Sequence, residues 1–534
     1  MSDNVSTPAK PDATAAASQT DVYAIQGADP EVLAYAMAKY SRSSLSMKQS
    51  LAEISSQRAE EFLNTFYFQY GHRSIADLAH IPFAIERLSL LAAITLVDEQ
   101  RWDGQERSTR YQNFRKSGWF TPALGQHTPS YTSSIEALFA AYDHVSAGTL
   151  DALKQAIPQP AEMNEDAYIR TLKARAFDVA RYLLPLATNT SLGQIVSART
   201  LEGQISRLLA SEFAEVRALG EKLRAAAASP AWNVTHLAAQ VLYQQIADAA
   251  PEFRTLLANY LLREVKTAPT LVKYSAPNAY AIATRAELRA AAHELMANQP
   301  IEPAPVVDLV DPSPTLEIEL ATSLLYAETH FSWRQIQRSI SALSAARIAE
   351  LVALGTKHRG PHDELPRAFS AGQSLQFDIL MDIGGFRDMH RHRRCVQLIQ
   401  SYTDLHGYET PVCPGQPTLA DSGLAETYTS AMNAAHTAFR NLRDASPSDV
   451  GASASEFAAD AAYLLPLGTR VRSIFKMDFA EALYISELRS GVAGHFSYRR
   501  VAWEMYRAIA QRHPALASSF RIEDVNQPVD LLRR

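Results

Sequence analysis

The sequence predicts an α+β protein in which one mainly helical domain with few strands occurs twice in tandem. Three observations lead to this prediction. Apolar side chains recur at helical spacing through much of the chain, only two short segments alternate as strands do, and the string YLLPL occurs at 182–186 and again at 463–467.

The helices are predicted from a capping pattern and from apolar stripes. Asp29-Pro30-Glu31 is typical of a helix start, with a capping acid, a proline at the first helical position and a second acid near the positive end of the helix dipole. Two later stripes also have helical spacing. They consist of Ile135, Leu138, Phe139 and Tyr142, and of Tyr428, Met432, Ala435, Phe439 and Leu442.

Two half-buried strands are predicted where apolar residues alternate, at 81–85 and at 375–381. A proline-rich stretch at 298–314 interrupts the helical pattern and predicts a linker that begins near Thr267. The expected organisation is a disordered tail at 1–20, a first domain at 21–266, a linker at 267–314 and a second domain at 315–534.

The order of elements supports the duplication. Each copy has an alternating strand followed by a charged motif, which is DEQRWDGQERSTRY at 98–111 and RHRRCVQLIQSYTD at 391–404. A proline and an amphipathic helix come next, then YLLPL. Each YLLPL is expected to lead into a long helical stretch that carries an arginine, Arg207 in the first copy and Arg489 in the second. A shared order of this kind favours duplication over chance.

Composition excludes some classes of protein. The 534 residues include 51 basic and 57 acidic side chains, so the net charge of −6 argues against a protein that coats nucleic acid by overall charge. Only two cysteines, Cys395 and Cys413, are present, which indicates a reducing cytoplasm. No apolar run approaches the roughly 20 residues that cross a bilayer.

The motif ERSTRY at 106–111 allows two interpretations. Glu106 and Arg110 are four residues apart and would simply pair if the segment were a helix. Alternatively, Ser108 and Arg110 present a hydroxyl and a guanidinium to a phosphate, and Glu106 accepts a hydrogen bond from a base or a sugar.

The run HRHRR at 390–394 has four candidate roles. It would be a solvated basic patch, an RNA contact, a metal site or a site for an anionic cofactor. RNA recognition favours interleaved aromatic residues, and none lies in the run. No acid or cysteine cluster completes a coordination set, so no metal site is predicted. Several cations at one place suit a diphosphate or a reduced flavin.

These motifs resemble those of the flavin-dependent thymidylate synthases. Arg391-His392-Arg393, seven further residues and Ser401 match the RHR-x7-S pattern of that family. The continuation of the family motif is similar to Glu106, Ser108, Arg110 and Tyr111 in the first copy. Further similar elements are Gly71-His72, Arg181 before the first YLLPL, Arg489 and, with a one-residue gap, Arg207. The resemblance covers about residues 30–220 and 315–510.

The resemblance implies a fold with a small antiparallel sheet and a flavin-dependent transfer of a one-carbon unit to C5 of a deoxyuridylate such as dUMP. The cofactor is FAD, with NADPH and methylenetetrahydrofolate as co-substrates. Arg489 and Arg207 are the expected catalytic arginines that polarise the pyrimidine. The expected flavin-binding residues are Arg391, His392, Arg393, His72 and Ser401. The expected substrate-binding residues are Glu106, Ser108, Arg110 and Arg181.

Neither copy has the complete family pattern. Asp98-Glu99-Gln100 stands where the family has RHR, which reverses the local charge of the first copy. In the second copy Ile399, Thr403 and Asp404 replace the glutamate, arginine and tyrosine of the motif, and Ala462 stands where the first copy has Arg181. The losses are complementary, so each chain is expected to retain one kind of competent site between its copies.

Because the family builds its sites from several subunits of a homotetramer, the expected assembly is a homodimer that forms a pseudo-tetramer. Two alternatives stay open. The chain would be a flavin enzyme of the same fold with a different anionic substrate, or a non-catalytic relative that binds nucleotides or RNA through HRHRR.

Overall fold

The computed structural model describes residues 23, 25, 27–39, 46–53, 73–126, 128–246, 249–360, 363, 365–369, 375–444, 459–514, 517 and 520–533. The expected tail at 1–20 and the candidate flavin residue His72 lie outside the described residues. Within the part described, no helix is both long and apolar enough to cross a membrane.

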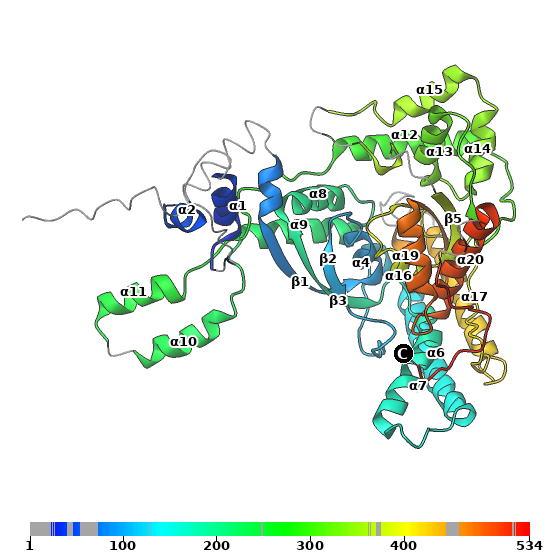
Figure 1. Cartoon of the computed structure of the whole chain (residues 1–534), viewed down its shortest axis with the longest axis horizontal. Coiled ribbons are helices and arrows are strands. Elements are labelled where there is room, and N and C mark those ends of the chain that lie inside the picture. The colour runs from blue at the N-terminus through cyan, green and yellow to red at the C-terminus, as the bar shows by residue number, and fades with distance from the viewer. Residues whose placement is uncertain are drawn as a thin grey trace, which may run out of the picture.

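The first copy consists of a three-stranded antiparallel sheet and the helices around it (Figure 1). Its strands lie in the order β1-β3-β2 and are β1 (His80–Ser89), β2 (Asp103–Glu106) and β3 (Asn189–Ser197). Its helices are α1 (Pro30–Lys39), α2 (Met47–Glu53), α4 (Leu90–Leu96), α5 (Ala123–Gln126), α6 (Pro129–Ala156), α7 (Glu165–Ala180), α8 (Ala198–Leu209), α9 (Ala214–Ala228), α10 (Thr235–Gln245) and α11 (Pro251–Leu261).

The second copy repeats this arrangement with one more strand. Its antiparallel sheet has the order β4-β5-β7-β6, formed by β4 (Val307–Leu309), β5 (Leu375–Asp382), β6 (Val396–Ile399) and β7 (Arg470–Met477). Its helices are α12 (Ala279–Leu295), α13 (Leu316–Tyr326), α14 (Trp333–Ser341), α15 (Ala345–Leu354), α16 (Ile383–Met389), α17 (Ala425–Arg443), α19 (Phe479–Ser490) and α20 (Phe496–Arg512). Short 3-10 turns at Arg73–Leu78, Arg181–Leu183 and Arg367–Phe369 complete the elements.

The copies correspond strand by strand, so the predicted α+β fold of two tandem units with small antiparallel sheets is confirmed. Strands β1, β2 and β3 match β5, β6 and β7 in sheet position. Ser89 and Asp382 end the matching first strands and cap the helices that follow, by accepting hydrogen bonds from Ala92 N and Gly385 N.

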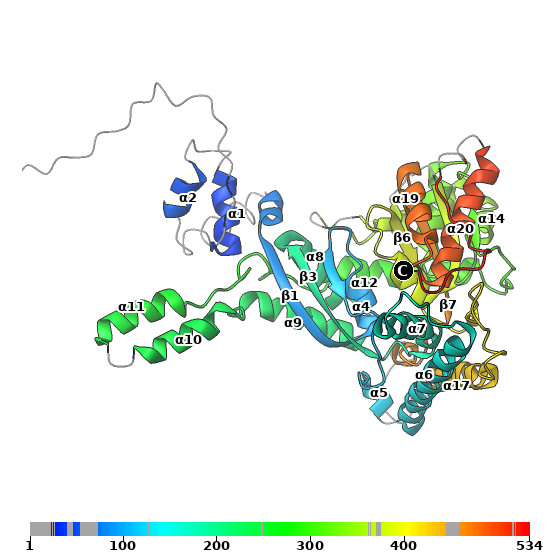
Figure 2. The same cartoon turned by 60° about the horizontal axis from the view of Figure 1, so that its bottom comes forward.

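The YLLPL segments pair with one another and join the two copies. Ala187 N donates to Tyr463 O at 2.9 Å, and its counterpart Gly468 N donates to Tyr182 O at 3.0 Å. Helices α6 and α17 lie side by side (Figure 2), and their predicted apolar stripes are buried in one core with residues of both copies. The copies therefore form one body around an internal two-fold relation.

Each copy inserts a tyrosine into an acid–hydroxyl pair of the other copy. In the first copy, Ser89 Oγ donates to Glu215 Oε2 at 2.5 Å. The pKa of Tyr463, which comes from the second copy, is raised mainly by burial and secondly by the negative charge of Glu215. In the second copy the acid and the hydroxyl are exchanged, because Ser497 donates to Asp382. Tyr182 OH also donates to Asp382, at 3.1 Å. The polar centre of the second copy is thus completed by a hydrogen bond from the first copy, whereas Tyr463 OH makes no hydrogen bond among the described residues.

The structure differs from the expected linker at 267–314. This segment contains α12, and its proline-rich part contains β4, which pairs with β5 at the edge of the second sheet. Prolines flank β4 without lying in it, so the ladder hydrogen bonds of an edge strand remain possible. The second sheet therefore begins before residue 315, and the other domain limits stay predictions.

Two further sequence expectations need correction. Each YLLPL leads into a strand, β3 or β7, before the helix that was expected there. The strand β5 is buried on both faces, because α13 and α14 cover its second face, where the buried carboxylate of Asp378 accepts hydrogen bonds from Tyr326 OH and Trp333 N. The expected alternation in β1 and the start of α1 at Pro30 are confirmed.

Candidate functional site

A cavity of about 160 Å³ lies between the two copies, where the end of β2 faces the segment after α16. The first copy contributes Glu106 of ERSTRY and four residues that precede it, and the second copy contributes Arg387 and three residues of the basic run. The lining residues are Val97, Trp102, Asp103, Gly104, Glu106, Arg387, His390, Arg391 and Arg393. Its volume is below the roughly 300 Å³ of typical ligand pockets, so it accepts one flat ring more readily than a whole dinucleotide.

Glu106 joins the two copies at this cavity. It does not pair with Arg110 on a helix, because β2 ends at Glu106 and the chain then turns. Its carboxylate instead forms an ion pair of 2.5 Å with Arg387 of α16. Arg387 also donates to Arg107 O at 3.1 Å. The helix interpretation of ERSTRY was therefore wrong, and Arg387 holds the motif from the opposite copy.

Arg110 lies beside the cavity but is already bound by protein groups. Its guanidinium forms a two-pronged ion pair with Asp178 of α7, at 2.7 and 3.1 Å. It also donates to Tyr498 OH of α20 at 2.9 Å and to Ala493 O at 3.0 Å. Ser108 is partly buried and accepts a hydrogen bond from Arg110 N at 3.2 Å.

Arg181 is almost completely buried next to this group, with 1% of its side chain exposed. It donates to Asp388 of α16 at 2.9 Å. Burial raises the pKa of Asp388, but Arg181, Arg110, Arg387 and Arg391 outweigh burial and lower the pKa to about 2. Asp388 therefore carries a negative charge at neutral pH.

The RHR residues have three different environments. Arg391 is exposed and makes no hydrogen bond or ion pair within the described residues. The guanidinium of Arg393 lies 5.1 Å from the centre of the Trp102 ring, which suits a cation–π contact. His392 is buried, and its Nε2 accepts a hydrogen bond from Arg489 Nε at 2.8 Å. Burial lowers the pKa of His392, so the neutral ring acts as this acceptor.

The two candidate catalytic arginines differ in what they bind. Arg489 makes one hydrogen bond, to His392, and its terminal nitrogens make none within the described part of the chain. Arg207 donates to Glu99 at 2.8 Å and to Thr95 O at 2.9 Å, so its guanidinium closes the end of α4. The structure thus leaves the terminal nitrogens of Arg489 without a protein partner among the described residues, although Arg489 lines none of the cavities described, and it ties Arg207 to its own copy.

The acids of the first copy face the basic run of the second. Asp98 pairs with Arg367 and lies 3.6 Å from His390 Nε2. Burial raises the pKa of Asp98, but Arg367, His390 and Arg207 together lower it. The motif that replaces RHR in the first copy therefore neutralises part of the charge beside the second copy's RHR.

The internal two-fold relation defines a second location, where the second copy's counterparts of ERSTRY face the first copy. The side chains there do not form a comparable group of ligand-type residues. Ser401 is exposed and lines none of the cavities described, although it was expected to bind flavin. Asp404 pairs with Arg440 at 2.6 Å. Ile94 lies five residues after Ser89, as Arg387 lies five residues after Asp382, so no arginine from α4 meets Ile399. The structure thus brings the ligand-type residues together at one location.

Sequence reasoning missed several side chains of this group, namely Asp178, Arg387, Asp388, Glu481 and Tyr498. Arg387 and Asp388 directly precede the basic run, so their position was a usable signal. Asp178 and Arg181 are three residues apart and could have been placed on one face of the same turn. Tyr498 comes from α20, and nothing in the sequence connects it with ERSTRY.

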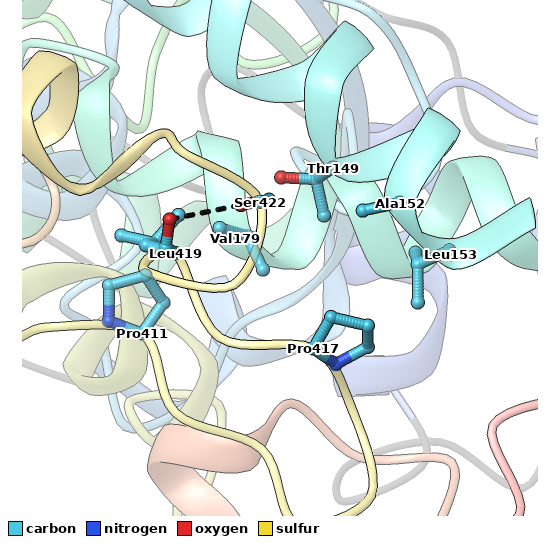
Figure 3. A pocket seen from close by; sticks show the side chains of 8 residues that line it. All are labelled: Thr149, Ala152, Leu153, Val179, Pro411, Pro417, Leu419 and Ser422. Atoms are coloured by element: carbon cyan, nitrogen blue, oxygen red, sulfur yellow. Dashed lines mark hydrogen bonds between the residues drawn. The ribbon is translucent and has the colours of Figure 1, made fainter. Parts of the chain in front are cut away.

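A second hollow (Figure 3) lies between α6, α7 and the segment before α17. Its volume is about 10 Å³, which is close to the space of a single water molecule. It is lined by Thr149, Ala152, Leu153, Val179, Pro411, Pro417, Leu419 and Ser422. Ser422 Oγ donates to Leu419 O within it at 3.1 Å. The hollow is too small for a substrate ring.

Comparison with known families matches the repeated architecture. The model of the family described as thymidylate synthase complementing protein matches residues 24–252 and, separately, residues 313–515. The chain belongs to the thymidylate synthase complementing protein family. The double match within this family confirms both the resemblance stated from the motifs and the tandem arrangement.

Relatives of similar length match most of the chain. A UPF0159 protein of Chlamydia muridarum is 26% identical over 530 residues, covering 93% of this chain and 91% of the relative. A UPF0159 protein of Thermoplasma acidophilum is 24% identical, covering 91% of this chain and 94% of the relative.

Two solved structures are also similar to one copy of this member of the thymidylate synthase complementing protein family. One is the UMP/dUMP methylase PolB from Streptomyces cacaoi bound with 5-Br dUMP, at 15% identity and a TM-score of 0.26 over 37% of this chain and 84% of that chain. The other is the flavin dependent thymidylate synthase from Helicobacter pylori complexed with FAD and dUMP, at 16% identity and a TM-score of 0.23 over 37% and 89%.

Proposed function

We propose that this chain is a flavin-dependent enzyme that transfers a one-carbon unit to C5 of a pyrimidine acceptor, for which dUMP is the reference candidate. Family membership supports methyl transfer to a pyrimidine at this coarse level. The observation that carries the proposal is the cavity in which Glu106 of the first copy meets Arg387, Arg391 and Arg393 of the second. Methylenetetrahydrofolate and NADPH are the proposed co-substrates.

The residues at this cavity fit one part of an anionic cofactor such as FAD, because the cavity is smaller than the whole dinucleotide. Arg391 is exposed and makes no ion pair within the described residues, and Arg393 is placed by Trp102. One buried donor, Arg393 Nε, has no hydrogen-bond partner among the described residues. When bound, FAD would supply the hydride that completes a methyl group. His72 and Ser401 stay predicted flavin contacts.

Arg489 is the proposed catalytic arginine, because its terminal nitrogens are available to stabilise negative charge on a pyrimidine oxygen. His392 orients it by accepting from Nε, and the proton on Nδ1 of His392 points to Glu481 Oε1 at 3.5 Å. Tyr498 lies under the guanidinium, with its ring centre at 5.4 Å. The guanidinium of Arg207 is already bound by Glu99 and Thr95 O. We therefore propose one active site in each chain.

We further propose that two chains form a homodimer, as the family resemblance implied, through the hairpin α10–α11. Figures 1 and 2 both show this hairpin extending away from the sheets. The exposed apolar side chains on the hairpin and directly before it are Trp232, Val234, Leu237, Val241, Leu242, Phe253, Leu256, Tyr260 and Leu261. Soluble monomers rarely expose such a patch.

The composition of the hairpin favours a second copy as the occupant. The helix α10 contains no Asp, Glu, Lys or Arg, and α11 contains one acid and one base, so two copies would not repel one another. The two helices contribute 11 residues each, close to the roughly 20–30 residues on one side of a standard interface. The same apolar face would suit a symmetric contact.

The test is purification, reconstitution with FAD and tritium release from C5 of labelled pyrimidines. A yellow protein that releases tritium in the presence of methylenetetrahydrofolate and NADPH supports the function. A colourless protein that does not bind FAD contradicts it and favours the non-catalytic nucleotide- or RNA-binding alternative. A location in the cytoplasm stays a prediction from the two cysteines, both of which are free.

A second candidate acceptor is favoured by one specific observation. Arg110 and Arg181 were expected to grip a phosphate, yet both already bind carboxylates of the protein. A flavin enzyme of the same fold with an acceptor other than a nucleotide monophosphate is consistent with this pairing.

A further inference from the structure

We propose that the second copy carries a separate binding site for a phosphate-sized oxyanion, formed by Arg470, Arg472, His406 and His330. None of the four lines the cavity between the two copies, so the inference does not depend on the proposed function. Arg472 donates to Asp378 at 3.0 Å, which places the group on the face of the second sheet that α13 and α14 cover.

A turn that contacts the start of the last strand is the same in both copies. Asn189 N donates to Gly118 O at 3.0 Å, and Arg470 N donates to Gly407 O at 2.9 Å. Both glycines have a positive φ, of 69° and 65°. A Cβ at Gly407 would lie 3.3 Å from Arg470 Nη2, so the guanidinium lies against this turn. Arg470 therefore occupies the position of Asn189 in an equivalent turn.

The side chains around this turn are neutral in the first copy and basic in the second. His406 directly precedes the glycine of the turn, where the first copy has Ser117. Arg472 matches Ser191, because the backbone oxygen of each accepts a hydrogen bond from the residue after β6 or β2, at 3.0 and 2.9 Å. Arg472 and Arg470 lie on the same face of β7, since side chains alternate along a strand. The second copy thus has two guanidiniums and an imidazole where the first has an amide and two hydroxyls.

The acids near this group leave one positive charge without a carboxylate. Arg472 is 2% exposed and pairs with Asp378 at 3.0 Å. No acid among the described residues, Glu409 of the same turn included, forms an ion pair with Arg470. The other acids of this region already have partners, in the pairs Asp308–Arg334 at 2.7 Å, Asp404–Arg440 at 2.6 Å and Glu328–Arg289 at 3.1 Å.

Two histidines lie beside the arginines. Burial, followed by the positive charges of these two arginines and of His330, lowers the pKa of His406 to about 4, which places these groups close together. Burial followed by Arg289 lowers the pKa of His330. No acid of the described part of the chain raises the pKa of either ring. Both rings are therefore neutral at pH 7, and each can carry its proton on a nitrogen that lacks a protein partner.

Four buried nitrogens of the group have no hydrogen-bond partner among the described residues, namely Arg470 Nε, Arg472 Nε, His406 Nε2 and His330 Nδ1. Buried polar atoms are normally paired, so a bound molecule is expected there. All four nitrogens can act as donors, and a guanidinium prefers the oxygens of a phosphate or a carboxylate. A tetrahedral phosphate suits donors that come from a strand, a turn and the segment before α14. Arg470, His406 and His330 are partly exposed, so solvent reaches the group.

The test is isothermal titration calorimetry with inorganic phosphate and with ribose 5-phosphate, at constant ionic strength. The variant Arg470→Gln removes the cation that has no carboxylate. The matched control Arg115→Gln removes an exposed guanidinium that pairs with Asp143 at 2.8 Å. A second control, Arg391→Gln, changes the cavity between the copies. Should Arg470→Gln fold poorly, His406→Gln removes a neutral donor of the same site.

We expect phosphate to bind the natural protein and Arg470→Gln to weaken this binding at least tenfold, because a charge-assisted hydrogen bond is lost. His406→Gln should weaken it at least threefold, and both controls should change it less than twofold. Tighter binding of ribose 5-phosphate than of phosphate identifies a phosphate ester as the ligand, whereas equal or weaker binding identifies free phosphate. Absence of binding, or binding that Arg470→Gln and His406→Gln leave unchanged, overturns the inference. Neither result bears on the proposed function, which FAD binding tests separately.

Discussion

Pro185 and Pro466 face one another in an isolated antiparallel bridge at the centre of the molecule. The hydrogen bonds on either side are equivalent, because Leu186 N donates to Leu465 O and Leu467 N donates to Leu184 O, both at 2.8 Å. Each YLLPL is thus the partner of the other, as in the self-complementary interface of a symmetric dimer. The two segments therefore hold the copies together through equivalent backbone hydrogen bonds.

Tyr182→Phe should lower the free energy of unfolding by about 1–2 kcal/mol, since it removes a buried hydrogen bond to Asp382 and leaves that carboxyl with one partner fewer. Urea unfolding followed by circular dichroism measures this loss. Tyr260→Phe is the control, because Tyr260 is 77% exposed on α11. Equal stability of the two variants would show that the exchange of tyrosines between the copies contributes nothing.

The sequence predicted those helices and strands in which the burial of one face determines the spacing of the apolar residues. The stripes of α6 and α17 and the alternation in β1 follow from one apolar face against the core. The four-residue strands β2 and β6 have no such pattern, because they lie within the charged motifs and are defined by pairing with β3 and β7. The strand β4 was missed because its prolines indicated a linker, although they only flank it.

The site could be predicted in part, through motifs that lie far apart in the chain. The meeting of Glu106 with Arg391 at one cavity agrees with the complementary losses of the two copies. The environment of Arg110 and Arg181 could not be predicted, because Asp178 and Asp388 come from α7 and α16 and reach these arginines only in the folded chain. Motif spacing shows which groups are present, while the tertiary structure decides which of them are neutralised.

Arg391→Ala should weaken FAD binding about tenfold or more, because a charge-assisted hydrogen bond contributes about 1.5–3 kcal/mol. Gln100→Ala changes the motif that replaces RHR in the first copy and should leave FAD binding unchanged. Flavin fluorescence titration compares the two variants. Equal weakening by both substitutions would contradict the division of roles between the copies.

His406→Gln should make the protein less sensitive to acid. Burial, followed by Arg472, His330 and Arg470, lowers the pKa of His406 to about 4. The unfolded chain binds this proton near pH 6.5, so the neutral folded ring loses stability as the pH falls from 6.5 toward 4. Between pH 7 and pH 5 the natural protein should lose about 1–2 kcal/mol more than the variant.

Urea unfolding at both pH values tests this difference, with the exposed His513→Gln as the control. A His406→Gln variant whose stability falls as steeply as that of the natural protein would show that His406 does not titrate in this way.

Leu237→Asp combined with Leu256→Asp should convert the proposed homodimer into a monomer. The two leucines are 57% and 53% exposed on α10 and α11, and a charge placed in an apolar interface is costly to bury. Analytical ultracentrifugation at micromolar concentration measures the mass. Leu316→Asp, at an exposed position on α13, should leave the mass unchanged. A natural protein that sediments as a stable monomer would refute the assembly itself.

Arg489 and Arg207 offer a matched pair in which one residue type has two different roles. Arg489→Ala should lower kcat about 100-fold or more, because removing one donor to a developing oxyanion has an effect of that order. Arg207→Ala should instead lower the free energy of unfolding by about 1–2 kcal/mol, since it breaks the contacts with Glu99 and the end of α4. Turnover per folded protein and urea unfolding, measured on both variants, separate the effects. A loss of kcat in Arg207→Ala as large as that in Arg489→Ala would mean that both copies carry a working site, and the closed contacts of Arg207 would then have to open during turnover.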